Sequence, residues 1–294
     1  MPGDRVLVRV DGRELELSNL DKVLYPRTGF TKGEMIDYYV RVAPVLLPYL
    51  RGRPLTRIRY PNGVAAQGFF EKNAPAGTPD WVRTVTLPVP GSTRSRETID
   101  FVVVDDVATL VWLANLAAIE LHTPQWRVSA DGDPRPPDLL VADLDPGPGT
   151  GLAECGLVAV AARERFALDG LAAVPKTSGK KGMQLVCRLP GTSGSEEING
   201  YAKTVAEDLE RALPELVVSR MARNLRAGKV FFDWSQNAAA KTTVAPYSLR
   251  AGDTPAVSAP LTWDEVESGR LAPLGPADVL ARVATGGDLL AEAA

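Results

Sequence analysis

The stretch that most constrains this chain lies near its middle, where an apolar run ends in Asp143-Leu144-Asp145 and then in Pro-Gly-Pro-Gly. The run indicates a buried strand that the prolines and glycines terminate. Residues two apart in a strand point to the same face, so both carboxylates would enter one space while Leu144 turns into the core. Such carboxylates repel unless a cation or a proton lies between them, and hard oxygen ligands favour Mg²⁺ or Mn²⁺. Taken alone, the pattern is equally typical of a strand that ends in an Asp-rich turn.

Composition narrows the classes of protein. The 294 residues and 45% hydrophobic content suffice for a sizeable core. A net charge of -3 means that nucleic-acid binding would depend on local basic patches, and a single histidine, His122, argues against histidine-built zinc sites. Two cysteines, no membrane-length apolar run and no signal-peptide pattern indicate a cytoplasmic protein without membrane contact. Because no repeat or low-complexity linker interrupts the chain, we expect one catalytic domain over residues 1–294.

Periodicity predicts a mixture of strands and helices. Thr31 and Glu34 form a capping-box pattern at the start of one helix. His122 falls at the end of another predicted helix. The expected elements are a hairpin over 5–17, a helix from Thr31, strands over 55–60 and 99–104, a helix over 107–121, the central strand from 139, helices over 152–166 and 198–213, a strand over 230–234 and an amphipathic C-terminal helix over 277–290. A polar basic loop is expected over 91–97.

Several basic residues occupy positions that suit an anion. Lys22 and Lys32 bracket the turn before the first helix, and a lysine at a helix N-terminus opposes the helix dipole but lies well beside a bound anion. Two solvated surface lysines are the alternative. Arg57 and Arg59 share one face of a predicted strand, which is either a phosphate-contacting face or an ordinary exposed face.

Two further segments carry possible binding chemistry. Phe69 and Phe70 are adjacent, so their rings point to opposite faces of an extended chain; either one ring stacks on a base, or the strand is buried on both sides. The turn over 178–182 is rich in glycine and lysine, which suits phosphate, although it lacks Walker A spacing. A basic segment then precedes a second aspartate that follows an apolar strand, Asp233.

Three ordered segments, D-L-D at 143–145, S-G-K-K-G-M-Q at 178–184 and D-W-S-Q-N at 233–237 with K-T-T-V-A-P-Y-S-L-R at 241–250, resemble the motifs of the archaeo-eukaryotic primase superfamily. They are most similar to the polymerase domain of bacterial ligase D, an end-joining repair polymerase. The similarity includes flanking segments at 17–26, 68–72 and 122–127 and covers nearly the whole chain. It implies an α+β fold with a primase-like core of mixed and antiparallel sheets flanked by helices and an RRM-like catalytic subdomain.

The resemblance also implies an activity. It predicts a template-dependent nucleotidyltransferase that adds nucleotides, preferentially ribonucleotides, to a primer 3′ end at gaps or double-strand breaks in bacterial non-homologous end joining. The mechanism would use two Mn²⁺ or Mg²⁺ ions. Implied partners are gapped or broken DNA with a 5′-phosphate, NTP or dNTP, Ku and a separate DNA ligase, in the nucleoid. Because the chain contains no K-x-D-G ligase nucleophile, we expect a free-standing polymerase or a part of a larger protein.

The resemblance assigns roles at matching positions. It makes Asp143, Asp145 and Asp233 the catalytic metal ligands, and Lys22 and Lys32 the pocket for the DNA 5′-phosphate. The residues that match nucleotide-binding positions are Phe69, Phe70, His122, Ser178, Lys181, Gln184 and Arg250, and those that match primer or template positions are Arg226 and Lys229. The chain departs from the family at Gln184, where the motif usually has histidine, so we predict a working but weaker contact to the triphosphate.

Two alternatives belong to other classes. A D-x-D phosphatase of the haloacid-dehalogenase type would use Asp143 as nucleophile, but Pro146 follows Asp145 and the expected Gly-Thr is not in place. A catalytically weak module that bridges DNA ends would have lost activity through Gln184. Template-dependent extension of a gapped duplex distinguishes all three hypotheses.

Overall fold

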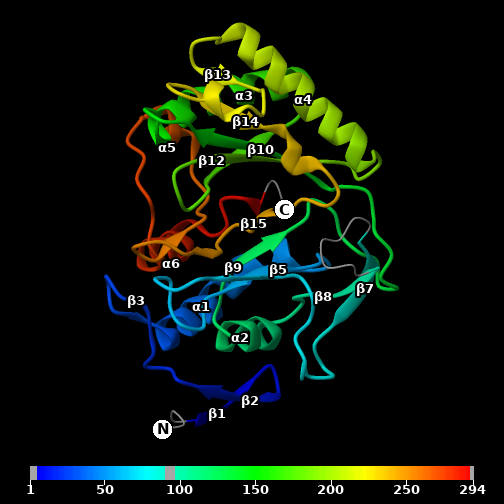
Figure 1. Ribbon diagram of the computed structural model, residues 1–294, viewed down its shortest axis with the longest axis vertical. Helices are drawn as coiled ribbons and strands as arrows, with labels where there is room; N and C mark the ends of the chain where they lie inside the picture. Colours follow the sequence, from blue (N-terminus) through cyan, green and yellow to red (C-terminus); the bar gives the residue numbers. More distant parts are fainter. Residues whose placement is uncertain (1–4, 90–96, 292–294) are drawn as a thin grey trace.

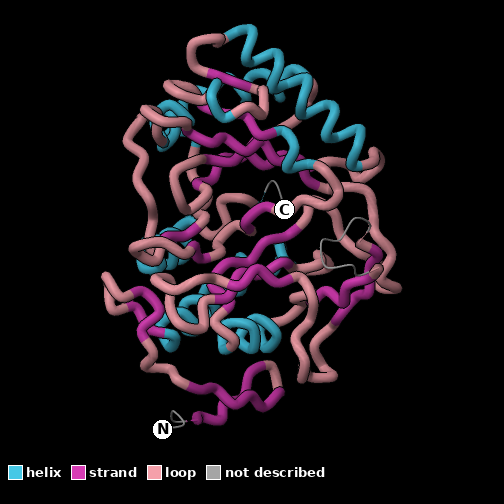
Figure 2. The backbone as a smooth tube through the Cα atoms, in the orientation of Figure 1, coloured by secondary structure: helices cyan, strands magenta, loops and turns pink. Residues whose placement is uncertain are grey.

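The computed structural model describes residues 5–89 and 97–291. Two sheets follow each other along the long axis, and helices cover the outer side of each (Figures 1 and 2). The expected loop over 91–97 lies almost wholly outside the described residues. No helix in the described ranges combines the length and the apolarity that crossing a membrane requires.

The first sheet has five strands in the order β11-β12-β10-β14-β13, antiparallel except for the last pair. Its strands are β10 (Leu139–Pro146), β11 (Ala173–Thr177), β12 (Met183–Arg188), β13 (Val217–Val218) and β14 (Val230–Asp233). Helices α3 (Leu152–Leu168) and α4 (Ser195–Ala212) cover one face. Leu144 is fully buried in the core beneath these helices. Its neighbours in sequence therefore point to the opposite face, toward the second sheet.

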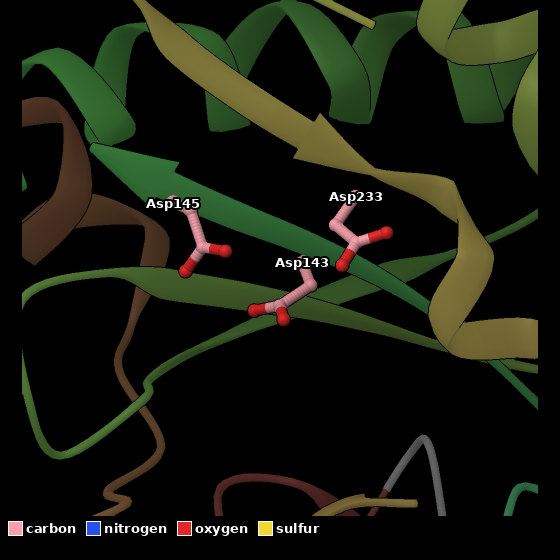
Figure 3. Close-up of side chains that lie close together, drawn as sticks. All are labelled: Asp143, Asp145 and Asp233. Carbon is pink, nitrogen blue, oxygen red and sulfur yellow. The ribbon is translucent and has the colours of Figure 1, made fainter. Parts of the chain in front are cut away.

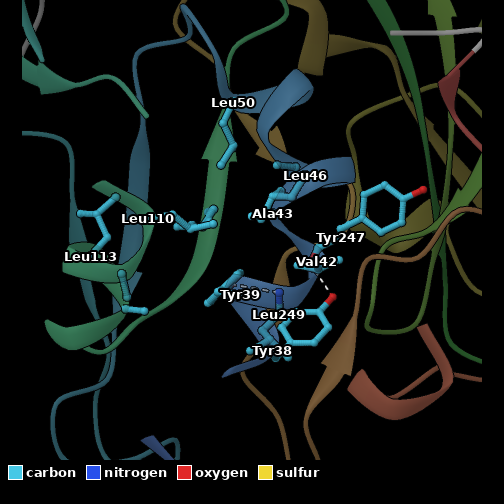
Figure 4. Packing of buried hydrophobic residues seen from close by; sticks show 14 of the residues in the cluster. Tyr38, Tyr39, Val42, Ala43, Leu46, Leu50, Leu110, Leu113, Tyr247 and Leu249 are labelled. Atoms are coloured by element: carbon cyan, nitrogen blue, oxygen red, sulfur yellow. Dashed lines mark hydrogen bonds between the residues drawn. The ribbon is translucent and has the colours of Figure 1, made fainter. Parts of the chain in front are cut away.

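The second sheet has four antiparallel strands in the order β15-β9-β5-β6. Its strands are β5 (Thr56–Arg59), β6 (Phe69–Glu71), β9 (Ala118–Thr123) and β15 (Thr243–Val244). Helices α1 (Lys32–Leu50) and α2 (Val107–Asn115) pack against each other in the core of this half (Figure 4). The phenolic oxygen of Tyr39 on α1 accepts the backbone N–H of Leu249 at 3.2 Å, so the C-terminal part of the chain packs on this core.

Short elements complete the described chain. The strand pairs are β1 (Arg5–Val10) with β2 (Arg13–Ser18), β3 (Val23–Tyr25) with β4 (Phe30–Thr31), β7 (Thr84–Pro88) with β8 (Thr98–Val102), and β16 (Leu249–Arg250) with β17 (Ala256–Val257). The remaining helical segments are η1 (Arg223–Leu225), η2 (Trp234–Asn237), α5 (Trp263–Glu267) and α6 (Pro276–Gly286). The predicted N-terminal hairpin and the Thr31–Glu34 capping box are both confirmed.

The predicted helix over 107–121 is wrong at its C-terminal end. Helix α2 ends at Asn115, Ala117 takes a positive φ of 59°, and β9 begins at Ala118. Strand β9 lies between two partners, since His122 is opposite Thr56 on one side and Val244 on the other. These long-range backbone hydrogen bonds outweigh the helical preference of a segment rich in alanine and leucine. His122 is therefore a residue of a central strand.

Two interpretations of surface residues also fail. Arg57 is fully buried and donates to Glu71 at 2.8 Å, and Arg59 donates to both oxygens of the same carboxylate at 2.9 and 2.7 Å. This face is thus not an ordinary exposed one, because Arg57 is buried and Glu71 pairs with both guanidinium groups. A strand buried on both sides is likewise wrong for Phe69 and Phe70, which are 49% and 55% exposed on the edge strand β6.

Candidate active site

Three carboxylates gather on the face of the first sheet that points away from α3 and α4 (Figure 3). Asp143 and Asp145 share one face of β10, and Asp233 on β14 lies directly opposite Asp143 in the antiparallel register. One oxygen from each residue lies within 4.8 Å of the others. In the ranges that the structure describes, no other trio of His, Cys, Asp or Glu meets this spacing. We call these three residues the carboxylate cluster.

The carboxylate cluster has the electrostatics of a cation site. Burial and then the charge of Asp145 raise the pKa of Asp143 to about 7. Burial and the charge of Asp233 raise the pKa of Asp145 as well. Carboxylate oxygens are the donors that Mg²⁺ and Mn²⁺ prefer, and a bound cation would relieve this repulsion. The residues present therefore fit a divalent metal.

Neighbouring side chains hold Asp233 in place. Its Oδ1 accepts the hydroxyl and the backbone N–H of Ser235 at 2.6 and 3.1 Å, and its Oδ2 accepts the amide of Gln236 at 2.8 Å. Both partners come from η2, which begins as soon as β14 ends. The D-W-S-Q segment therefore supplies both the carboxylate and the donors that orient it.

The Pro-Gly-Pro-Gly turn brings the basic segment before β14 against the end of β10. A Cβ on Gly147 would lie 1.8 Å from the carbonyl oxygen of Arg226, so only glycine fits there. The Arg226 guanidinium stacks 3.6 Å from the ring centroid of Phe231 and opposes the rise in the pKa of Asp145. By contrast, the Lys229 ammonium donates to the carbonyl of Pro214, so the structure does not bring it to the carboxylates.

A second charged group, the cation cluster, consists of Glu120, His122, Lys180 and Arg250. Glu120 is fully buried on β9 and accepts from His122 Nε2 at 3.0 Å and from the backbone N–H of Ala251 at 3.0 Å. The ammonium of Lys180 lies 3.2 Å from Oε1, and Nε of Arg250 lies 3.6 Å from Oε2. One anion thus gathers three basic side chains.

The electrostatics of the cation cluster favour a further anion. Burial opposes ionisation of Glu120, but the hydrogen bond from His122 and the charges of Arg250, His122 and Lys180 lower its pKa to about 2. Burial lowers the pKa of His122 below its ordinary value. The Nε atom of Arg250 is buried and has no hydrogen-bond partner. The cluster therefore has donor capacity and positive charge left for a ligand.

The glycine-rich turn lies beside the cation cluster, and Lys180 belongs to both. The Ser178 hydroxyl accepts the backbone N–H groups of Lys180 and Gly182 at 3.3 and 3.2 Å, which closes the turn. Lys181 is exposed at its tip. Ser178 thus shapes the turn, and Lys181 remains open to a ligand.

Gln184 lies elsewhere, among the carboxylates. It is 4% exposed, stands opposite Asp143 in the register of β12 and β10, and donates to Asp143 Oδ1 at 3.0 Å. Its carbonyl oxygen accepts from Lys176 at 2.5 Å. Both ends of the amide are therefore engaged within the protein, so the structure gives no support to the predicted contact between Gln184 and the triphosphate.

The two predicted phosphate-pocket lysines lie together at the start of α1. Lys32 is only 4% exposed and donates to the carbonyl of Ser18 at 2.5 Å and to Asn115 Oδ1 at 2.7 Å, while Lys22 donates to Asn62 at 3.4 Å. Burial and the charge of Lys22 lower the pKa of Lys32 to about 8. These described partners are all neutral, so no carboxylate among the described residues pairs with either lysine.

Three charged residues beside these clusters were not predicted from the sequence: Glu120, Lys176 and Lys180. Glu120 is two residues before His122, so a strand assignment would have placed both on one face. The incorrect helix concealed this pattern. Lys176 has no charged residue directly beside it in the sequence, and its sequence neighbours give no indication that it is buried.

The comparisons with known proteins agree with one another. Residues 31–290 match the family model described as the LigD primase-polymerase domain. The multifunctional non-homologous end joining DNA repair protein LigD of Mycobacterium tuberculosis is 45% identical over 283 residues, which are 95% of this chain and 37% of that protein. The bifunctional LigD of Bacillus subtilis is 34% identical over 256 residues, which are 87% of this chain and 40% of that protein. The chain therefore spans somewhat over a third of the length of these relatives.

A solved structure gives the same result for the fold. The polymerase domain from Mycobacterium tuberculosis ligase D in complex with DNA superposes with a TM-score of 0.91 at 45% sequence identity. The match covers 95% of this chain and 97% of that one. The expected α+β primase-like architecture is confirmed.

Proposed function

The chain belongs to the LigD primase-polymerase domain family, and on that premise we propose that it is a DNA-directed nucleotidyltransferase that extends a primer 3′ end at gaps or breaks during non-homologous end joining. Relatives are named non-homologous end joining proteins, and the structural relative is a polymerase domain bound to DNA. The observation that carries the proposal is the carboxylate cluster, in which two strands bring three acidic side chains within 4.8 Å. We take residues 1–294 as one catalytic unit.

We assign Asp143, Asp145 and Asp233 as ligands of two divalent cations, Mn²⁺ or Mg²⁺. When bound, such ions lower the pKa of the primer 3′-hydroxyl and neutralise the leaving pyrophosphate. The chain's own residues orient the ligands: Ser235 and Gln236 hold Asp233, and Gln184 holds Asp143. Arg226 lies at the edge of this site beside Asp145, where it would contact the primer or the template.

The cation cluster supplies the site for the nucleotide. Glu120 offsets only part of the positive charge of Lys180 and Arg250, while His122, with its lowered pKa, contributes a hydrogen bond, so a triphosphate would complete the balance. Ser178 closes the glycine-rich turn, and Lys181 at its tip would add a charge-assisted contact. The exposed rings of Phe69 and Phe70 would stack on the nucleotide and the template base.

Lys22 and Lys32 would bind the 5′-phosphate on the far side of a gap. Two ammonium groups with neutral hydrogen-bond partners suit a phosphate dianion. The wider assignment is also part of the proposal: a preference for ribonucleotides, and cooperation with Ku and a ligase. The relatives' names and the partial length of the match support cooperation with other repair activities.

Extension of a 5′-phosphorylated gapped duplex tests the proposal. With Mn²⁺, the wild-type chain should add templated nucleotides until the gap is filled, while Asp143→Asn should bind the duplex but add none. Binding by the wild type without extension would favour the bridging module. A transient aspartyl-phosphate on Asp143 would favour the phosphatase. Undiminished extension by Asp143→Asn would overturn the metal assignment.

A further inference from the structure

Lys176 on β11 is a fully buried lysine that neither the sequence motifs nor the proposed chemistry uses. Its side chain lies in the protein interior with 1% of its surface exposed. The ammonium donates to Gln184 Oε1 at 2.5 Å, to Ser258 Oγ at 2.6 Å and to the carbonyl of Val244 at 3.2 Å. Three donors thus meet three acceptors, so Lys176 has no hydrogen left for a substrate.

The contact with Gln184 continues directly to the metal centre. Lys176 stands opposite Gln184 in the register of β11 and β12, and Gln184 stands opposite Asp143 in the register of β12 and β10. The amide of Gln184 accepts from Lys176 and donates to Asp143 Oδ1 at 3.0 Å. A line of three side chains therefore crosses three adjacent strands and ends on a carboxylate.

We propose that Lys176 is a positioning residue for the metal centre: it fixes the Gln184 amide in the one orientation that donates to Asp143. An ammonium can only donate, so a flipped amide would turn its NH₂ group toward Lys176 and its carbonyl toward the carboxylate. Both contacts would then be repulsive. This inference rests on the proposed metal role of Asp143, and partners of this kind orient metal ligands in many sites.

A purely electrostatic role predicts a different outcome in the double variant. A buried positive charge repels a divalent cation but also lowers the pKa of Asp143, so charge alone would change the Mn²⁺ affinity whether or not Gln184 is present. If Lys176 positions Gln184, its removal lets the amide turn and weakens Mn²⁺ binding only while Gln184 is present. The double variant therefore separates the two roles.

The experiment titrates Mn²⁺ into the full chain, without nucleotide or DNA, and follows the free ion by electron paramagnetic resonance. Lys176→Met keeps a long apolar stem and removes the donors; Gln184→Met removes the amide. Each should weaken Mn²⁺ binding about tenfold, and the double variant should bind no more weakly than either single variant, because both changes break the same line. Lys241→Met, a matched change at an exposed position, should leave the affinity unchanged.

Thermal unfolding of the same variants without metal measures whether the two residues are linked. Each single change leaves a buried polar group unpaired, whereas the double change removes both groups. The double variant should therefore lose less melting temperature than the two single variants lose in total. If Lys176→Met alone does not fold, the double variant is compared with Gln184→Met, and equal Mn²⁺ affinities are expected.

Three outcomes overturn the inference: Lys176→Met binds Mn²⁺ as tightly as or more tightly than the wild type, the losses of affinity are additive, or the double variant differs from Gln184→Met. Failure of the proposed function is distinguishable, because then the wild type would bind no Mn²⁺, or Asp143→Asn would bind it as well as the wild type.

Discussion

The carboxylate cluster and the cation cluster carry opposite charges but have a similar arrangement, in which several side chains of one type accompany one buried side chain of the opposite type. In the first, three acidic side chains lie near one buried lysine, Lys176, whose pKa burial lowers to about 7; in the second, three basic side chains surround one buried anion, Glu120. Each cluster keeps an excess of one sign. The excess in the first suits metal ions, and the excess in the second suits a triphosphate. The opposite charges of the two proposed ligands therefore correspond to opposite charge excesses that the protein has without them.

The two buried counter-charges differ in how they reach their cluster. Glu120 contacts its basic neighbours directly, at 3.0 to 3.6 Å, whereas Lys176 reaches Asp143 only through the neutral amide of Gln184. A lysine placed directly on Asp143 would compete with a metal for its oxygens. An amide donates a hydrogen bond without bringing a full charge into the site.

The largest loss of activity is expected from a change in the carboxylate cluster. Asp233→Asn should lower nucleotide addition by about a thousandfold or more, because an amide cannot replace a carboxylate as a metal ligand. Without metal, relief of the repulsion with Asp145 opposes the loss of one acceptor for Ser235 or Gln236, so the melting temperature should change little. Primer extension and thermal unfolding measure the two effects. Substantial activity in this variant would remove Asp233 from the metal site.

Glu120→Gln tests the opposite cluster. Removing a fully buried anion leaves the surrounding basic groups uncompensated, which should cost about 3–5 kcal/mol of unfolding free energy. A triphosphate would restore negative charge, so a nucleotide should raise the melting temperature more in the variant than in the wild type. Chemical denaturation and thermal shift with and without nucleotide measure these effects. An equal nucleotide-induced shift in both proteins would show that the triphosphate binds elsewhere.

Lys22 and Lys32 can be compared with the cation cluster, because among the described residues no buried anion pairs with these two lysines. Lys32→Met should weaken binding of 5′-phosphorylated gapped DNA by roughly tenfold or more, since charge-assisted hydrogen bonds contribute about 1.5–3 kcal/mol. Binding of the same duplex without the phosphate should change little. Equal weakening of both duplexes would make these lysines general backbone contacts.

The lowered pKa of Lys32 adds a pH dependence to the same contact. With a pKa of about 8 in the free protein, Lys32 is charged below pH 8 and increasingly neutral above it. Only the charged form attracts phosphate, so the preference for phosphorylated ends should fall as the pH rises through about 8. Fluorescence anisotropy between pH 7 and 9 measures this preference. In Lys32→Met the dependence should disappear.

The smallest effect is expected at Lys180. Its side chain is 47% exposed, and its pair with Glu120 is partly screened by water. Lys180→Met should raise the KM for the nucleotide by roughly twofold to fivefold, in keeping with the 0.2–1 kcal/mol typical of exposed pairs. Steady-state kinetics on a gapped duplex measure it. A loss as large as that of an aspartate variant would mean that Lys180 contacts the reacting phosphate.

Local spacing was enough to place Asp143 and Asp145 on one face, because alternation along a strand is independent of the rest of the fold. The position of Asp233 opposite Asp143 was not predictable in this way. It depends on which strands pair and in which register, and those pairings join distant segments. The family resemblance, rather than periodicity, identified this third aspartate.

Three of the residues that escaped prediction are buried charged side chains. Arg57, Glu120 and Lys176 look like surface residues by type, yet each is buried beside a partner from another part of the chain. A single sequence does not show such partners, and the cost of burying a charge makes an exposed position the natural expectation. The incorrect helix end at β9 has the same origin, because long-range strand pairing decided it.

The pairing of β10 with β14 also fixes when the metal centre can exist during synthesis. Protein synthesis proceeds from the N-terminus, so Lys22 and Lys32 emerge from the ribosome first, the two aspartates of β10 follow, and Asp233 comes much later. A shift of one residue in the register between β10 and β14 would turn Asp233 to the opposite face. A nascent chain therefore carries the lysines that we propose bind a DNA end well before it carries all three aspartates of the proposed metal site.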